Sequence, residues 1–187
     1  MLKWLTNFTY KIEQRASEDD AVYQVACKYY EEVVHKEAVL ASITETDHML
    51  CIGGGICPFS AILFHQNTGA KVTVIDNNVA CIPKARQVIE KLGISEHVEV
   101  SHADGASDTV DLSAYSVVHL ALQVEPVEHV FSRIEAQVKP GTKLLVRRPK
   151  KGLSAIYDKL EASSAYVSHK ACNIGATFLY IKEDAAI

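Results

Sequence analysis

From residue 47 onward, short apolar runs alternate with amphipathic stretches, and this alternation constrains the fold more than any other feature of the chain. Strands are expected at HMLCI, KVTVI, VEV, SVVHLAL, KLLVR, AYVSHKA and GATFLYI. Helices are expected from about Phe59, over 79–92 and 126–138, and over 153–161. Such alternation is typical of a mostly parallel sheet with both faces covered. The sequence therefore predicts an α/β, Rossmann-like fold built on a seven-stranded sheet.

The two ends of the chain depart from this pattern. The last two expected strands have only Asn173 and its neighbours between them, which favours an antiparallel hairpin at the end of the sheet. The start of the chain has helical spacing, and Ser17 with the acidic residues after it is expected to cap one of the short N-terminal helices. We therefore predict an N-terminal helical segment over residues 1–46 and a Rossmann-like domain over residues 47–187.

Charge and composition exclude several classes of protein. The chain has 187 residues and a net charge of −4, whereas a nucleic-acid-binding protein normally needs a basic face. No apolar run approaches the roughly 20 residues needed to cross a bilayer, and the N-terminus lacks the pattern of a secretory signal. The five cysteines and eight histidines show no spacing typical of a metal site. We expect a cytoplasmic protein with no metal and no nucleic-acid or membrane partner.

The stretch CIGGGICPFSAI, residues 51–62, places three glycines after the first expected strand and before a helix. At that edge of an α/β sheet, glycines let the chain turn sharply and let a ligand lie against the backbone. A carboxylate at the end of the second strand can bind both ribose hydroxyls, and one after the third strand can bind the adenine amine. The expected adenosine-binding residues are Gly53, Gly54, Gly55, Asp76, Asn77, Asp104, Gly105 and Leu120.

The details of the glycine loop favour one adenosine ligand. A dinucleotide-binding loop has the spacing G-x-G-x-x-G, but in GGGICP the third glycine is missing, and Cys57 and Pro58 occupy the start of the helix. The chain also lacks the G-K-S or G-K-T of a nucleoside triphosphate loop. S-adenosylmethionine carries no phosphates, so we expect it to be the co-substrate.

At this point the sequence resembles a known family. IGGGICPFSAILF is similar to the I-G-(S/G)-G-P-x-P-x-(T/S) loop of nicotianamine synthases, which have a class I S-adenosylmethionine-dependent methyltransferase fold. The likeness continues in KYYEEVVHKEAVL and in VVHLALQVEPVEHVFSRIEAQVKPGTKLLVRRPKKGLSAIYDKL, and covers about residues 27–182. The resemblance implies transfer of a 3-amino-3-carboxypropyl group from S-adenosylmethionine to the amine of a small amino-acid-like acceptor, giving a metal chelator.

The resemblance also implies where the acceptor binds. The paired tyrosines of the family imply a pocket lined by Tyr29 or Tyr30. The family's catalytic glutamate lies well upstream of the tyrosine helix, on a segment for which this chain has almost no room. Glu37 is seven residues after Tyr30 and therefore on the same helical face. We predict that Tyr30 and Glu37 are the catalytic residues.

Three further residues are expected to bind the substrate. Arg147, at the end of the fifth strand, and Tyr157 match positions of the family's pattern. Arginine binds a carboxylate through two parallel hydrogen bonds, which suits an amino-acid-like substrate or the methionine carboxylate. Glu125 follows the fourth strand, where many class I enzymes place a catalytic or substrate-contacting group.

Three functions are consistent with these residues. The first is the aminocarboxypropyl transferase that the resemblance implies, and the second is a methyltransferase acting on a small molecule. The third is a non-catalytic S-adenosylmethionine-binding subunit, in which the N-terminal helices form a dimerisation face; a homodimer is among the expected assemblies. The nucleoside by-product distinguishes them, because aminocarboxypropyl transfer leaves methylthioadenosine and methyl transfer leaves S-adenosylhomocysteine.

Overall fold

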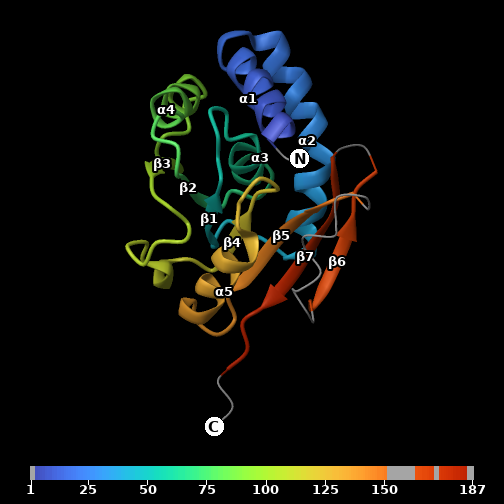
Figure 1. Ribbon diagram of the computed structural model, residues 1–187, viewed down its shortest axis with the longest axis vertical. Coiled ribbons are helices and arrows are strands. Elements are labelled where there is room, and N and C mark those ends of the chain that lie inside the picture. The colour runs from blue at the N-terminus through green and yellow to red at the C-terminus, as the bar shows by residue number, and fades with distance from the viewer. Residues whose placement is uncertain (1–2, 151–162, 171–172, 185–187) are drawn as a thin grey trace.

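The computed structural model describes residues 3–150, 163–170 and 173–184, and its centre is one seven-stranded sheet with the order β3-β2-β1-β4-β5-β7-β6 (Figure 1). The strands are β1 (His48–Ile52), β2 (Lys71–Asp76), β3 (Val98–His102), β4 (Val117–Leu120), β5 (Lys143–Pro149), β6 (Ala165–Ser168) and β7 (Ile174–Ile181). Neighbouring strands from β3 to β5 pair in parallel, and β7 pairs antiparallel with both β5 and β6. The predicted mostly parallel sheet and C-terminal antiparallel hairpin are both confirmed.

Helices cover both faces of this sheet. They are α1 (Lys3–Glu18), α2 (Asp20–Leu40), α3 (Phe59–Thr68), α4 (Ile82–Lys91), the 3-10 helix η1 (Leu112–Ala114) and α5 (Val127–Gln137). Alternate residues of a strand point to opposite faces, so Met49 and Cys51 of β1 join a core with α2, α3 and α4. Leu50 and Ile52 join a second core with η1 and α5. The sheet is therefore buried on both faces, which explains its continuous apolar strands.

The N-terminal helices differ in detail from the sequence-based expectation. Asp19, and not Ser17, caps α2: its side chain accepts hydrogen bonds from the backbone N–H groups of Ala21 and Val22. Ser17 lies inside α1 and donates to the carbonyl of Gln14. The 21-residue helix α2 is longer than α1, which packs beside it (Figure 1). The expected helix over 153–161 lies outside the described residues, and the domain boundary at residue 46 stays a prediction.

The strand order places an opening at one edge of the sheet. β1 pairs with β2 on one side and with β4 on the other, so the strand order reverses at β1: the chain runs from β1 outward to β2 and β3 and then returns to β4. In open α/β sheets, ligands bind beside the carboxyl ends of the strands at such a switch point. Gly53, directly after β1, has a φ of 84° and begins the loop at this point. In the described part of the chain, no helix has the length and apolarity to cross a membrane.

Candidate functional site

A cavity of about 410 Å³ lies at this edge of the sheet, within the size range of small-molecule sites. It is bounded by the loops after β1, β2, β3 and β4, by α1 and α2, and by the end of β5. Most of the residues expected to form the site line it together: Tyr29, Tyr30, Gly53, Gly54, Gly55, Asp76, Asn77, Asp104, Gly105, Glu125 and Arg147. The fold thus brings residues from both sides of residue 46 into one cavity.

The three glycines of the loop are required for two different reasons. Gly53 and Gly55 have φ values of 84° and 65°, a backbone conformation that side chains other than glycine rarely adopt. Gly54 has ordinary backbone geometry, but a Cβ atom there would lie 2.2 Å from Cγ1 of Val74 in β2. Gly54 is therefore required by packing against the neighbouring strand, in addition to any approach of a ligand.

Asp76 ties this loop to the end of β2. Its Oδ2 accepts a hydrogen bond from the backbone N–H of Gly55 at 2.8 Å, and its Oδ1 accepts one from Asn78 at 2.9 Å. An ionised carboxylate has about four lone-pair positions, so both oxygens can accept a further bond. Asp76 is thus able to order the loop and to bind the hydroxyl groups of a ligand in the cavity.

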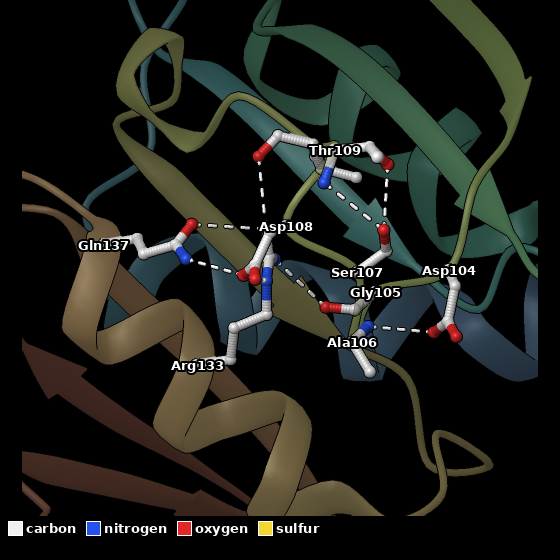
Figure 2. A network of polar contacts seen from close by, with 9 residues as sticks. Asp104, Gly105, Ala106, Ser107, Asp108, Thr109, Arg133 and Gln137 are labelled. Carbon is white, nitrogen blue, oxygen red and sulfur yellow. Dashed lines mark hydrogen bonds and ion pairs between the residues drawn. The ribbon is translucent and has the colours of Figure 1, made fainter.

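The loop after β3, which carries Asp104 and Gly105, is held from below by α5. Figure 2 shows Arg133 of α5 reaching this loop, where its guanidinium donates to the carbonyl of Gly105. The same guanidinium donates to the carbonyl of Val110. It also donates to Asp108, at 3.2 Å. Asp104 accepts a hydrogen bond from the backbone N–H of Ala106 through Oδ1 only, at 2.8 Å. Asp104 lines the cavity, and no hydrogen bond joins its second carboxylate oxygen to a described residue.

Glu37 and Arg147 form a buried ion pair behind the opposite end of the cavity. Arg147 Nε donates to Glu37 Oε1 at 2.8 Å and Nη2 donates to Glu37 Oε2 at 2.7 Å, so the contact is bidentate. Thr177 of β7 donates a third hydrogen bond to Oε1, at 2.5 Å. Burial alone would raise the pKa of Glu37, but Arg147, assisted by Thr177 and by the nearby His119, holds it well below its ordinary value. Glu37 is therefore ionised at neutral pH.

The surroundings of Glu37 differ from those expected of the catalytic residue that its helical position predicted. Glu37 is fully buried and does not line the cavity, and both of its oxygens are occupied. Arg147 does line the cavity, where its Nη1 donates to Ser60 at 2.8 Å. The arginine expected to bind a substrate carboxylate is thus oriented by a carboxylate of the protein itself.

A glutamate that the sequence analysis missed lies on the other side of the cavity. Glu13 of α1 lines the cavity, and its Oε2 accepts a hydrogen bond from the backbone N–H of Ile56 at 3.0 Å. Burial, and to a smaller extent the nearby carboxylate of Asp76, raise the pKa of Glu13 to about 8. With this raised pKa, Glu13 exchanges its proton near neutral pH.

The remaining expected residues lie in different surroundings. Tyr30 stacks on Phe59 with ring centroids 5.6 Å apart, and its ring lies 6.0 Å from the guanidinium carbon of Arg147. Leu120 is fully buried in the core below the cavity and does not line it. Tyr157 lies outside the described residues. Within the described ranges, no group of three or more potential metal ligands is present.

Comparison with known proteins connects this cavity to a family. The family model described as nicotianamine synthase protein matches residues 28–174, which include the tyrosine helix, the glycine loop and the strand that ends near Arg147. This chain belongs to the nicotianamine synthase family. The resemblance noted from the sequence is thereby confirmed. No curated protein is a significant match to the chain.

Solved structures confirm the class I methyltransferase fold of this family member. A glutamine-for-glutamate mutant of MtNAS in complex with S-adenosylmethionine is 24% identical, with a TM-score of 0.80 over 97% of this chain and 76% of that chain. MtNAS in complex with MTA and tNA is 25% identical, with the same TM-score over 96% and 73%. An RNA methyltransferase from Salinibacter ruber in complex with S-adenosyl-L-homocysteine is 20% identical, with a TM-score of 0.67 over 83% and 94%.

Two cavity residues were missed for different reasons. Glu13 enters the site because α1 packs against the rest of the molecule, and nothing in its local sequence indicates this. His119 stands in the run VVHLAL of a strand buried on both faces, so a polar residue there was a usable signal. It is 1% exposed and lines the floor of the cavity.

Proposed function

We propose that this member of the nicotianamine synthase family joins a 3-amino-3-carboxypropyl group from S-adenosylmethionine to the amine of a small amino-acid-like acceptor. Family membership makes the chain an S-adenosylmethionine-dependent transferase, and this is the observation that carries the proposal. The related MtNAS was crystallised with S-adenosylmethionine and with MTA and tNA. MTA, methylthioadenosine, is the nucleoside that remains when an aminocarboxypropyl group leaves the sulfonium.

We propose that the parts of the co-substrate bind in different parts of the cavity. We propose that the adenosine lies against the glycine loop, with the ribose hydroxyls donating to Asp76 and the adenine amine to Asp104. The methionyl arm then extends toward Tyr30 and Arg147, at the opposite end of the cavity. Tyr29 and Glu125 line the cavity as well, and we propose that they contact the acceptor.

The chemistry requires orientation and the removal of one proton. The sulfonium is already activated, so the protein has to hold a neutral amine in line with the carbon that reacts. The amine nitrogen attacks the methylene carbon bonded to sulfur, the C–S bond breaks, and its electron pair stays on the sulfur of methylthioadenosine. We propose that the proton lost by the amine passes to Glu13, whose raised pKa suits a general base near neutral pH. Glu37, in this proposal, orients Arg147.

The reaction class can be tested by mass spectrometry of the nucleoside products. The protein is incubated with S-adenosylmethionine alone and with each of the common amino acids, and methylthioadenosine and S-adenosylhomocysteine are quantified. Methylthioadenosine together with an aminocarboxypropyl adduct is the expected result. S-adenosylhomocysteine with a methylated acceptor would instead establish the methyltransferase alternative, and binding without either product would establish the non-catalytic subunit.

The role of Glu13 has its own test. Glu13→Gln keeps the size of the side chain and its hydrogen bond from Ile56 but removes the base, so the rate should fall roughly 10²- to 10⁴-fold. The rate of the unmutated protein at low substrate should rise with pH up to about 8, since a carboxyl group must lose its proton to act as a base. Unchanged affinity for S-adenosylhomocysteine is the control. A mutant that retains the rate and the pH profile would exclude Glu13 as the base.

We further propose that the enzyme acts in the cytoplasm as a homodimer and has no nucleic-acid partner. The net charge of −4 supports the last point, because nucleic-acid binding normally uses a basic surface. Val25 and Val39 on the outside of α2 are 71% and 65% exposed and offer apolar surface to a second copy. Light scattering of Val25→Asp and of the unmutated protein tests this, and equal monomeric masses would exclude the dimer.

A further inference from the structure

A single arginine of α5 holds both ends of the loop after β3. The side chain of Arg133 is 7% exposed. Its Nη1 donates to the carbonyl of Gly105 at 3.2 Å, and its Nη2 donates to the carbonyl of Val110 at 3.3 Å. A guanidinium presents its donors in a rigid planar fork, so the two carbonyls are held in one geometry relative to each other. Arg133 therefore fixes the shape of this loop from the side of α5.

One peptide group connects Arg133 to Asp104. The carbonyl of Gly105 and the N–H of Ala106 belong to the same planar unit, and they point to opposite sides of it. The carbonyl accepts the hydrogen bond from Arg133, and the N–H donates to Asp104 Oδ1 at 2.8 Å (Figure 2). Because the unit is rigid, the bond at one end sets the direction of the bond at the other. Arg133 thereby orients the carboxylate of Asp104 without touching it.

Packing holds the same peptide group against the sheet. A Cβ atom at Gly105 would lie 2.6 Å from Cγ2 of Ile52 in β1 and 3.5 Å from Cγ1 of Val130 in α5. Val130 precedes Arg133 by three positions, so both lie on the same face of α5. Gly105 and Asp104 line the cavity. The loop is therefore seated on β1 and α5 at the point where it meets the cavity.

The ion pair of Arg133 with Asp108 contributes less to this arrangement than the bonds to the two carbonyls. Asp108 is 85% exposed, and ion pairs in contact with water are worth little. Gln137 donates to the same oxygen of Asp108, at 2.9 Å, so this carboxylate keeps a donor without Arg133 (Figure 2). The bonds to the carbonyls are partly buried, and a carbonyl that loses its donor there costs more.

We propose that Arg133 is a positioning residue that makes the cavity selective for adenine over purines without the exocyclic amine, because it holds Asp104 where the amine can donate to it. This proposal rests on the proposed function, which places the adenine beside Asp104. A carboxylate only accepts hydrogen bonds, so a purine with a carbonyl oxygen at the amine position offers it a second acceptor and is disfavoured. A hydrogen bond weakens steeply when its geometry is lost, so this selectivity depends on the position of Asp104.

The experiment measures the binding of two nucleosides by calorimetric titration. Methylthioadenosine carries the amine, and methylthioinosine carries a carbonyl oxygen in its place. The unmutated protein should prefer methylthioadenosine about 10- to 100-fold. Arg133→Gln should weaken methylthioadenosine about tenfold and methylthioinosine at most about twofold, so that most of the preference is lost. Arg133→Lys supplies one donor group in place of the planar fork and should retain an intermediate preference.

Three control variants test whether the effect passes through Asp104. Arg86→Gln removes an arginine of α4 whose Nε donates to the carbonyl of Val100 in β3, and it should leave the preference unchanged. Asp108→Ala removes the exposed ion pair and should alter the preference by no more than about twofold. Asp104→Ala should abolish the preference. In that background Arg133→Gln should have no further effect on it, because two residues that act as a unit are not additive.

Other outcomes overturn the proposal. If Arg133→Gln weakens the two nucleosides equally, Arg133 has a structural role and does not determine which base binds. If the preference survives in Arg133→Gln, or in Arg133→Lys should the former not fold, Arg133 does not position Asp104. An unmutated protein that binds both nucleosides equally would refute the selectivity and leave the proposed function intact. One that binds neither nucleoside would refute the proposed function itself, so the two failures are distinguishable.

Discussion

The buried pair of Glu37 and Arg147 predicts a large loss of stability when either partner is removed alone. Glu37 is 0% exposed and Arg147 is 3% exposed, so water cannot replace a missing partner. Glu37→Leu leaves the guanidinium buried without its carboxylate, and breaking such a pair costs about 3–5 kcal/mol of unfolding free energy. The lowered pKa of Glu37 has the same direction, because Arg147 stabilises the ionised carboxylate by more than burial disfavours it.

Urea unfolding followed by circular dichroism measures this loss, and a double mutant is the decisive control. Glu37→Leu combined with Arg147→Met removes both charges and fills the space with apolar atoms, so it should recover most of the stability lost in Glu37→Leu. Thr177→Val removes two hydrogen bonds, the third one to Glu37 and the one between Thr177 Oγ1 and His169 Nε2, but no charge, and should cost less than either single charge removal. If the unfolding free energy of Glu37→Leu lies within about 1 kcal/mol of that of the unmutated protein, or is no lower than that of the double mutant, Arg147 does not depend on Glu37 for its charge compensation.

The same pair has a defined pH dependence. Because the pKa of Glu37 is lower in the folded state than in the unfolded state, this group contributes its full stabilisation above the unfolded value of 4.5. The contribution is lost as the pH falls from about 5 through the folded value near 2. The double mutant of Glu37 and Arg147 should lose less stability than the unmutated protein between pH 5 and pH 3. If the unfolding free energies of the two proteins fall equally with pH, Glu37 does not have the lowered pKa that we describe.

Three further predictions concern the nucleoside end of the cavity. Asp76→Ala should weaken S-adenosylhomocysteine by about 1–3 kcal/mol in calorimetry, and unchanged affinity would remove Asp76 from the site. Gly54→Ala should lower the unfolding free energy by about 1–3 kcal/mol through its contact with Val74, and Val74→Ala should relieve most of this loss in a double-mutant cycle. Arg133→Gln should weaken the nucleoside about tenfold by releasing the loop after β3; an equal affinity would show that the loop is ordered without it.

Much of the fold could be predicted because its signals are local. The strand runs and the amphipathic stretches each occupy a few consecutive residues, and their alternation leaves few topologies. The cap of α2 was misplaced by two residues, since Ser17 and Asp19 are both good capping residues and the choice depends on where α1 ends. The sequence also showed helical spacing before residue 46 without showing that these helices would reach the ligand edge of the sheet.

For the site, the sequence predicted the residues at strand ends but not the contacts between distant residues. The glycines, Asp76 and Asp104 follow strand ends, so their position in the fold follows from the order of the elements alone. Glu37 and Arg147 were both selected, but that they bind each other depends on packing between residues 110 positions apart. No spacing rule covers such a distance. An arginine without an acidic residue close to it in the sequence is therefore easily interpreted as a substrate-binding group, although the tertiary structure pairs Arg147 with Glu37.

The two glutamates show why residue type alone could not assign the catalytic roles. Glu37 is fully buried and Glu13 is partly buried, and burial raises the pKa of a carboxyl group. At Glu37 the guanidinium of Arg147 reverses this effect and keeps the group ionised, whereas Glu13 has only backbone donors and the nearby Asp76, and its pKa rises to about 8. Where the surroundings push the pKa values of two carboxyl groups apart, the one near neutrality is suited to proton transfer and the other to fixed charge. The helical position of Glu37 is therefore less informative than the surroundings of Glu13, where no cationic side chain of the described residues offsets the effect of burial.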